Sequence, residues 1–189
     1  IYRWKMSSAC KRADRVIAVS ECTKRDIMRY FGTPEEKITV LYQGCDQQFR
    51  QVVTESHKAA IRNRYHLPDH FILYVGSIEQ RKNLLLLAQA LDRMEDKNIS
   101  VIALGHRTSY AKRVKKFVAA AGLRRRFRMI SGVAFSDLPV FYQMADVFVY
   151  PSRYEGFGIP MLEALCSGVA AIGCTGSCLE EAGGPSSLY

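Results

Sequence analysis

The chain has 189 residues, of which 48% are hydrophobic and 24% are charged, values close to those of an ordinary soluble globular protein. That length allows one well-buried domain and part of a second, and no apolar run approaches the roughly 20 residues of a membrane-spanning helix. The net charge of +9 fits an anionic partner or simply a solvated basic surface. The arginines at 124–126 have no interleaved aromatic residues, so we do not expect nucleic acid as the partner.

The start of the chain and its cysteines bear on where the protein works. Residues 1–5 lack the apolar core of a signal peptide, and position 1 is not Met, so we expect a fragment of a longer protein. Neither the cysteines nor the histidines have metal-ligand or disulfide spacing, so we expect free thiols and no bound metal. Free thiols are typical of a reducing compartment, and we therefore predict a cytoplasmic location.

The first part of the chain contains a few regular elements and no core of its own. Residues 15–20 form a predicted strand, and Ser20 caps a helix over residues 22–31 that ends at Gly32. A second strand covers residues 38–42, and a polar linker follows over residues 43–57. We therefore expect residues 1–48 to be the tail of a preceding domain with its crossover, and residues 49–70 to be a linker and lead-in helix.

From residue 71 onward, short apolar strands alternate with helices. The strands are predicted at residues 71–76, 99–104, 127–130, 146–150 and 169–172, and Leu188 begins a sixth. The helices are predicted at residues 84–94, 110–121 and 160–167, with one more that is capped by Ser136 and runs to Met144. Such alternation predicts an α/β fold with a parallel sheet and right-handed crossovers over residues 71–189. Ligands of such sheets bind beyond the carboxyl ends of the strands.

The segment at 154–163 is the strongest candidate for a site. It follows a predicted strand, contains Gly156 and Gly158 before a helix that begins near Pro160, and carries Glu155 and Glu163 eight positions apart. A helix N-terminus after glycines binds anions, so the carboxylates must bind something else, for which sugar hydroxyls are the natural candidates. The alternatives are general acid/base work by the pair and a solvated Glu163 on the helix surface. The pattern favours a nucleotide-sugar site.

A second candidate segment, 76–83, follows the first strand of the sheet. Arg81 and Lys82 stand at the start of a helix, where cations oppose the helix dipole. A diphosphate bound between them would remove that conflict, whereas the alternative is two solvated side chains. His106 and Val133 follow the next two strands, and their backbone groups are candidates for contact with a base or a sugar.

The segments 76–83, 145–152 and 155–163 together resemble the retaining glycosyltransferases of the GT-B fold. More narrowly, nearly the whole chain is similar to the group-1 glycosyl transferases, which include bacterial polysaccharide mannosyltransferases. The resemblance implies two Rossmann-like, doubly wound domains with the active site in the cleft between them. Residues 71–189 would be the C-terminal, donor-binding domain, incomplete at its end. The chain would then be truncated at both ends, and the fragment alone would be inactive because the acceptor side is missing.

The resemblance also assigns roles to individual residues of a hexosyltransferase that retains anomeric configuration. Arg81, Lys82 and Glu155 would be catalytic, with the two cations on the diphosphate and Glu155 on the transferred sugar. The implied donor-binding set is Gly76, Ser77, Arg81, Lys82, His106, Val133, Glu155, Phe157, Gly158, Ile159 and Glu163. Glu163 would contact the ribose and Val133 the base.

The implied partners are a nucleotide-diphosphate sugar, with GDP-mannose favoured, and a glycan or lipid-linked acceptor in cell-surface polysaccharide synthesis. No metal or other cofactor is implied. The protein would work in the cytoplasm, peripherally at the inner face of the cytoplasmic membrane. Two positions depart from the family pattern: Ser77 stands where many members have Arg, a role that we expect Arg81 to take, and Glu180 stands where members often have Pro. The alternatives are a nucleotide-sugar 2-epimerase and a non-catalytic nucleotide-binding module.

Overall fold

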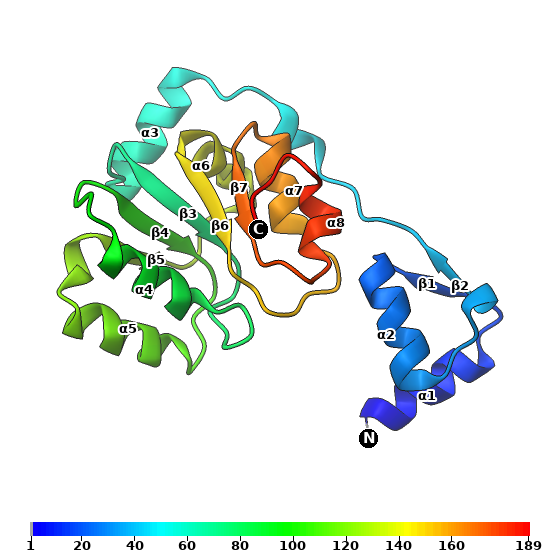
Figure 1. Cartoon of the computed structure of the whole chain (residues 1–189). Coiled ribbons are helices and arrows are strands. Elements are labelled where there is room, and N and C mark those ends of the chain that lie inside the picture. The colour runs from blue at the N-terminus through cyan, green and yellow to red at the C-terminus, as the bar shows by residue number, and fades with distance from the viewer. Residues whose placement is uncertain (1) are drawn as a thin grey trace.

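A computed structural model describes residues 2–189 and arranges them as a small N-terminal unit and a larger α/β unit (Figure 1). The small unit contains α1 (Tyr2–Arg12), β1 (Val16–Ala18), α2 (Glu21–Phe31) and β2 (Ile38–Val40), and its two strands pair in parallel. The cap expected for α2 is confirmed, because the Ser20 hydroxyl accepts a hydrogen bond from the Thr23 amide. Gly32 ends α2 in the left-handed conformation at φ 63°. Helix α1 was not predicted from the sequence.

The larger unit is built on a five-stranded sheet in the order β5-β4-β3-β6-β7, in which all pairs are parallel. The predicted α/β fold is therefore confirmed. The strands are β3 (Phe71–Val75), β4 (Ser100–Leu104), β5 (Phe127–Ile130), β6 (Val147–Tyr150) and β7 (Ala171–Gly173). Strand β3 lies at the centre, which explains its unbroken run of apolar residues. Leu188 adds only an isolated bridge to Ile172, so the expected sixth strand is a single contact.

The helices cover both faces of this sheet. The chain moves from β3 outward to β4 and β5 through α4 (Leu84–Arg93) and α5 (Ala111–Ala120), which lie side by side (Figure 1). It then returns through α6 (Leu138–Met144) and α7 (Ile159–Cys166) to β6 and β7 on the other side of β3. Because crossovers are right-handed, this reversal puts α6 and α7 on the opposite face. The reversal between β3 and β6 is the switch point at which such sheets bind ligands.

Two further helices and a short turn complete the unit. Helix α3 (Glu55–Tyr65) packs against α6, and α8 (Leu179–Gly183), which the sequence did not reveal, packs against α7. The segment expected to be a polar linker contains a short 3-10 helix, Gln47–Arg50, whose Phe49 is fully buried. The Phe49 ring lies 5.7 Å from the rings of both Phe135 and Tyr142, so this segment is anchored in the core.

The prediction that Ser136 caps a helix was wrong. Residues Phe135–Asp137 form a 3-10 turn, α6 begins at Leu138, and no side chain caps it. Asp137 is buried instead and accepts hydrogen bonds from Tyr65 and Arg64. The Pro that follows Leu138 suits the first turn of a helix and has no amide hydrogen to be capped, which moves the start of α6 past Ser136.

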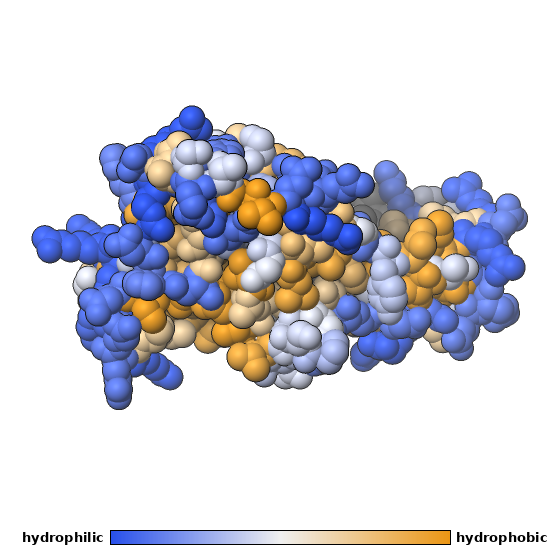
Figure 2. Space-filling view, turned by 90° about the horizontal axis from the view of Figure 1, so that it is seen from above, coloured by the Kyte–Doolittle hydropathy of each residue, from blue (hydrophilic) through white to orange (hydrophobic). Residues whose placement is uncertain are grey.

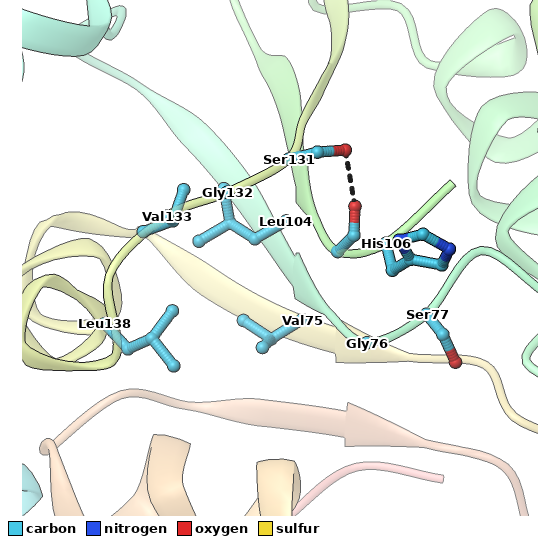
Figure 3. Close-up of a pocket in the computed structure, with 10 residues that line it drawn as sticks. Val75, Gly76, Ser77, Leu104, His106, Ser131, Gly132, Val133 and Leu138 are labelled. Carbon is cyan, nitrogen blue, oxygen red and sulfur yellow. Dashed lines mark hydrogen bonds between the residues drawn. The ribbon is translucent and has the colours of Figure 1, made fainter. Parts of the chain in front are cut away.

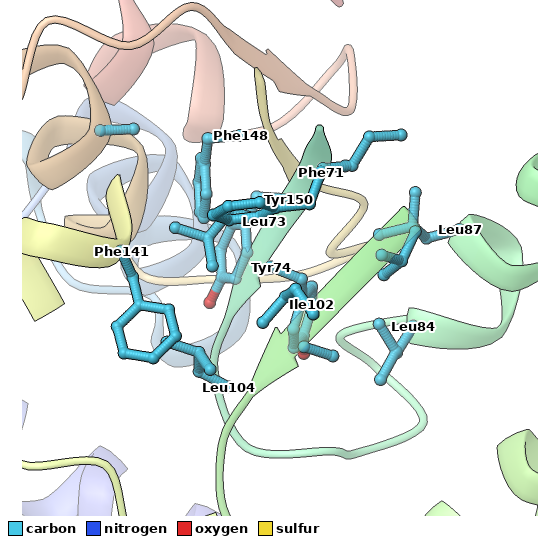
Figure 4. Packing of buried hydrophobic residues seen from close by; sticks show 14 of the residues in the cluster. Phe71, Leu73, Tyr74, Leu84, Leu87, Ile102, Leu104, Phe141, Phe148 and Tyr150 are labelled. Atoms are coloured by element: carbon cyan, nitrogen blue, oxygen red, sulfur yellow. The ribbon is translucent and has the colours of Figure 1, made fainter. Parts of the chain in front are cut away.

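Large aromatic side chains fill the centre of the core (Figure 4). The ring of Tyr150 lies 5.9 Å from Phe148 and 6.0 Å from Tyr74. A buried tyrosine needs a partner for its hydroxyl group. Tyr74 donates to the Ser77 carbonyl, and Tyr150 donates to Glu155. These rings therefore connect the packed core to the carboxyl edge of the sheet.

Hydrophilic residues cover the two ends of the molecule when it is seen from above, and hydrophobic residues are visible between them (Figure 2). Among the exposed large hydrophobic residues of the small unit, Trp4 lies on α1, Ile17 lies in β1 and Leu41 directly follows β2. All six cysteines are free. None of the helices within residues 2–189 is both long and apolar enough to cross a membrane.

Candidate functional site

The loops that follow β3 and β6 meet at the switch point of the sheet. The amide of Arg153 donates to the carbonyl of Arg81 over 2.9 Å, which holds the two loops side by side. The β3 loop carries Arg81 and Lys82, and the β6 loop carries Glu155. The two segments singled out in the sequence are therefore adjacent in space.

An ion-pair cluster joins these loops. Arg81 Nη1 lies 2.8 Å from Glu155 Oε2, and Lys82 Nζ lies 3.3 Å from Glu155 Oε1. The side chains of Lys82 and Glu155 are each only 12% exposed. The structure thus brings together the three residues predicted to be catalytic. We call them the Glu155 cluster.

Two hydroxyl groups that the sequence did not reveal complete this cluster. Tyr150 Oη and Ser152 Oγ donate to Glu155 Oε1 over 2.9 and 2.8 Å, and Lys82 Nζ donates to Tyr150 Oη over 2.5 Å. Burial by itself would raise the pKa of Glu155, but the hydrogen bond from Arg81 and the charge of Lys82 outweigh it and lower the pKa. Burial raises the pKa of Tyr150 well above its usual value. At neutral pH the carboxylate is therefore ionised and the phenol is a donor.

Arg81 also forms an ion pair with a second carboxylate, that of Glu79. Glu79 Oε2 lies 3.2 Å from Arg81 Nε, and Ser77 Oγ donates to Glu79 Oε1 over 2.6 Å. The Ser77 hydroxyl, together with the charge of nearby Arg81, lowers the pKa of Glu79 against the opposing effect of burial. Ser77 therefore positions the partner of Arg81. Arg81 and Lys82 are therefore both already paired with carboxylates. An anionic ligand that binds to them would have to displace these carboxylates.

A pocket of about 280 Å³ opens beside the cluster at the ends of β3, β4 and β5 (Figure 3). It contains four of the predicted donor-binding residues, and its full lining is Val75, Gly76, Ser77, Leu104, Gly105, His106, Ser131, Gly132, Val133 and Leu138. A Cβ atom on Gly76 would lie 3.3 Å from Lys82 Nζ, so the pocket adjoins the Glu155 cluster. A Cβ atom on Gly105 would lie 1.9 Å from the Gly76 carbonyl oxygen, and only glycine allows the two loops to approach this closely.

Helix α7 carries the second carboxylate of the 154–163 segment. Gly158 precedes the helix at φ 115°, where a side chain would strike Leu179, and Pro160 lies in the first turn as predicted. Phe157 is buried, and Ile159 lies at the surface.

Glu163 itself is only 8% exposed, so the alternative of a solvated Glu163 is wrong. Its Oε2 accepts a hydrogen bond from Tyr142 Oη over 2.9 Å. Burial raises the pKa of Glu163, although the Tyr142 hydroxyl acts in the opposite direction. Glu155 and Glu163 therefore belong to two different hydrogen-bond networks.

The small unit touches the loop that carries Glu155. Ser20 and Thr23, at the start of α2, donate their hydroxyl hydrogens to the Gly156 carbonyl over 2.6 and 2.8 Å. The carboxylate of Glu181 accepts from the amides of Glu21 and Cys22 over 2.6 and 2.8 Å, which places a negative charge at the N-terminus of α2. No motif in the sequence indicates these contacts.

The described part of the chain contains no cluster of side chains with the composition of a metal site. Across residues 2–189 no group of three or more His, Cys, Asp or Glu side chains is arranged to hold a metal ion. The chemistry that these residues offer is hydrogen bonding and charge stabilisation.

A doubly wound parallel sheet with a polar site at its switch point defines a Rossmann-like ligand-binding domain. The chain belongs to the group 1 glycosyl transferases, whose family model matches residues 58–182. A model for glycosyltransferase family 4 matches residues 1–49. The chain has the GT-B fold of this family.

Among proteins of similar sequence is the O-antigen chain mannosyltransferase B of Escherichia coli, with 31% identity over 180 residues, 93% of this chain and 47% of the relative. The serotype-specific mannosyltransferase WbdA of E. coli is 28% identical over 177 residues, which cover 90% of this chain and 22% of that protein. The chain thus spans less than half the length of these two relatives.

Solved structures show the same fold at lower identity. A glycosyltransferase from Rickettsia africae superposes with a TM-score of 0.82 at 20% identity, covering 95% of this chain and 49% of the other. Anabaena Alr3699/HepE, solved in complex with UDP and glucose, gives a TM-score of 0.83 at 22% identity with the same coverage.

Proposed function

We propose that this chain is the donor-binding half of a retaining glycosyltransferase that transfers a hexose from a nucleotide-diphosphate sugar to an acceptor hydroxyl. The observation that carries the proposal is the meeting of Arg81, Lys82 and Glu155 beside the Gly76 pocket. Two cations, one carboxylate and an adjoining hollow match a ligand that combines a diphosphate, a sugar and a base.

The proposed chemistry is an exchange of partners within the Glu155 cluster. When a donor binds, Arg81 and Lys82 turn from Glu155 to the diphosphate, and the freed carboxylate accepts hydrogen bonds from the hydroxyls of the sugar. As the bond to the sugar breaks, negative charge develops on the departing diphosphate, and the two cations stabilise it. The amides at the start of α7, near Phe157, Gly158 and Ile159, add donors for the same charge.

The nucleotide is proposed to lie across the pocket. The apolar walls formed by Leu104, Val133 and Leu138 suit a base, and the backbone at His106 lies at the pocket rim. Glu163 is proposed to accept from the ribose, because Tyr142 occupies only its Oε2. No metal or other cofactor takes part.

The proposed donor is GDP-mannose, and the acceptor is a glycan or lipid-linked sugar in cell-surface polysaccharide synthesis. The support is that relatives at 28% and 31% identity are named mannosyltransferases, one of them for an O-antigen chain. We place the protein in the cytoplasm, peripherally at the inner face of the membrane, where its net charge of +9 favours anionic lipids.

A calorimetric titration with GDP, UDP and ADP tests donor binding. Lys82→Ala and Glu163→Ala should each lower the affinity for the preferred nucleotide about tenfold, the loss expected for one charged hydrogen bond. Lys116→Ala removes the same charge from an exposed position on α5 and is the matched control. Unchanged affinity in both site variants would remove the proposed site.

Glu155→Ala tests the sugar contact in the intact enzyme. Nucleotide binding should be kept while transfer of the sugar is lost, because the carboxylate is proposed to act on the sugar hydroxyls. Full retained turnover would contradict its role.

A further inference from the structure

A second polar hollow lies on the α4/α5 side of the molecule. It measures about 210 Å³, and its polar lining is formed by Gln80, Asn83, Gln89, Tyr110, Arg113 and Arg153. These residues come from the turn before α4, from α4 itself, from the start of α5 and from the loop after β6. None of them lines the pocket beside the Glu155 cluster.

Two arginines converge on this hollow without a carboxylate. Within residues 2–189, neither Arg113 nor Arg153 has an acidic group within ion-pair distance, and none of the residues that line the hollow is acidic. In contrast, Arg81 on the neighbouring loop holds both Glu79 and Glu155. Two unpaired guanidinium groups facing one hollow favour an anionic ligand.

Asn83 supplies an independent observation. It lines the hollow, it is only 8% exposed, and it stands before α4 at φ 56° without capping the helix. No hydrogen bond of its side chain is found in the part of the chain that the structure describes. Its carboxamide is open to solvent, since the fully buried side-chain atoms without a partner among the described residues are Thr33 Oγ1 and Ser167 Oγ. Its carboxamide NH₂ group offers donors to a ligand in the hollow.

The start of α4 adds backbone donors. The helix has ten residues, long enough for its N-terminus to favour an anion. The amides of Leu84 and Leu85 donate to no carbonyl within residues 2–189, whereas the amide of Asn83 donates to Gln80. The first amides of a helix need a partner from outside it. Leu85 also lines the hollow, so the guanidinium groups, the carboxamide and the Leu85 amide together form a donor set for a tetrahedral oxyanion.

We propose that the hollow between Arg113 and Arg153 binds a phosphate group, separately from the donor site. The ligand class is a phosphate ester, carried either by a soluble compound or by a lipid headgroup. Because the Arg153 amide is bonded to the Arg81 carbonyl, the bound phosphate lies one loop away from the Glu155 cluster. The site would therefore hold a phosphorylated molecule next to the place where sugar transfer is proposed.

Nuclear magnetic resonance of the whole chain tests the proposal with inorganic phosphate and glycerol 3-phosphate. The amide signals of Leu84 and Leu85 should shift with added phosphate, and the Arg113→Gln/Arg153→Gln double variant should weaken this binding at least tenfold, as expected for the loss of charged hydrogen bonds. Lys112→Gln/Lys116→Gln is the control, since it removes the same number of charges from exposed positions on α5. Both arginines are exposed, so the variant should fold.

Separate outcomes distinguish this site from the donor site. Lys82→Ala should lose affinity for the nucleotide and keep the phosphate-dependent shift of the Leu84 amide signal. The double arginine variant should keep its affinity for the nucleotide and lose that shift. Reduced binding of the double variant to phosphatidylglycerol vesicles, compared with Lys112→Gln/Lys116→Gln, would assign the phosphate to a lipid, and equal binding would assign it to a soluble ester. Unmoved Leu84 and Leu85 signals, or equal phosphate affinity in the double variant, would overturn the proposal.

Discussion

Replacing Glu163 by Gln tests whether a buried carboxylate is kept for binding at a cost in stability. The substitution preserves size and an oxygen that can accept from Tyr142, but it removes the charge. Because burial raises the pKa of this carboxyl group, the folded protein disfavours its ionised form. Glu163→Gln should therefore stabilise the protein at neutral pH.

The sign and the magnitude follow from linkage. A carboxyl group whose folded pKa lies above its unfolded value contributes stability that is complete below the unfolded value, 4.5, and is lost as the pH rises through the folded pKa. Each unit by which the folded pKa exceeds the unfolded pKa is worth about 1.4 kcal/mol at pH 7, which sets the scale of the gain. Each kcal/mol gained corresponds to about 2–4 °C in melting temperature for a chain of this size. Below the unfolded pKa the advantage should vanish.

Urea unfolding of both proteins at pH 4 and pH 7 measures this difference, and calorimetry measures nucleotide affinity. Glu95→Gln is the matched control, because Glu95 is exposed. We expect Glu163→Gln to be more stable at pH 7 and to bind nucleotide roughly fivefold more weakly, since a neutral acceptor forms a weaker hydrogen bond than a carboxylate. A variant that is less stable at pH 7, or that gains equally at both pH values, would refute the reasoning.

Three further substitutions probe the fold and the cluster. Phe49→Ala should cost about 3–5 kcal/mol of unfolding free energy in urea, because the ring is fully buried, and a loss below about 1 kcal/mol would contradict its anchoring role. Gly105→Ala should cost more than 2 kcal/mol, since its Cβ would overlap the Gly76 carbonyl, and a neutral result would place the two loops further apart. Tyr150→Phe should cost about 1 kcal/mol by removing the hydroxyl shared by Lys82 and Glu155, and a stability equal to that of the parent would count against it.

The sequence predicted most of the larger unit because its signals are local. Strand β3 is an unbroken apolar run, and Ser20 and Gly32 carry the start and stop signals of α2. The meeting of Arg81 with Glu155 was also within reach, since the carboxyl ends of parallel strands share one edge of the sheet.

What the sequence did not reveal depends on contacts between distant residues. Nothing within the 154–163 segment shows that Tyr142 on another helix covers Glu163, so a solvated carboxylate was the default alternative. The sequence marks Tyr150 only as a residue of a strand. The role of its hydroxyl group depends on Glu155, the partner to which it donates in the folded protein. Helix α1 has a weak amphipathic pattern and no acidic residue in its first turn, which leaves little local signal for it.

The contact between the two units gives the Glu155 loop a mechanical connection to the small unit. Gly156 is held by Ser20 and Thr23, and Glu181 is held by the first amides of α2. A hinge motion that swung the small unit away would break these bonds and release the residue next to Glu155. By reciprocity, any ligand that repositions this loop must also shift the opening equilibrium of the two units. The distance between the two units should therefore change when such a ligand binds, and a pair of fluorescent labels, one on each unit, would measure that change.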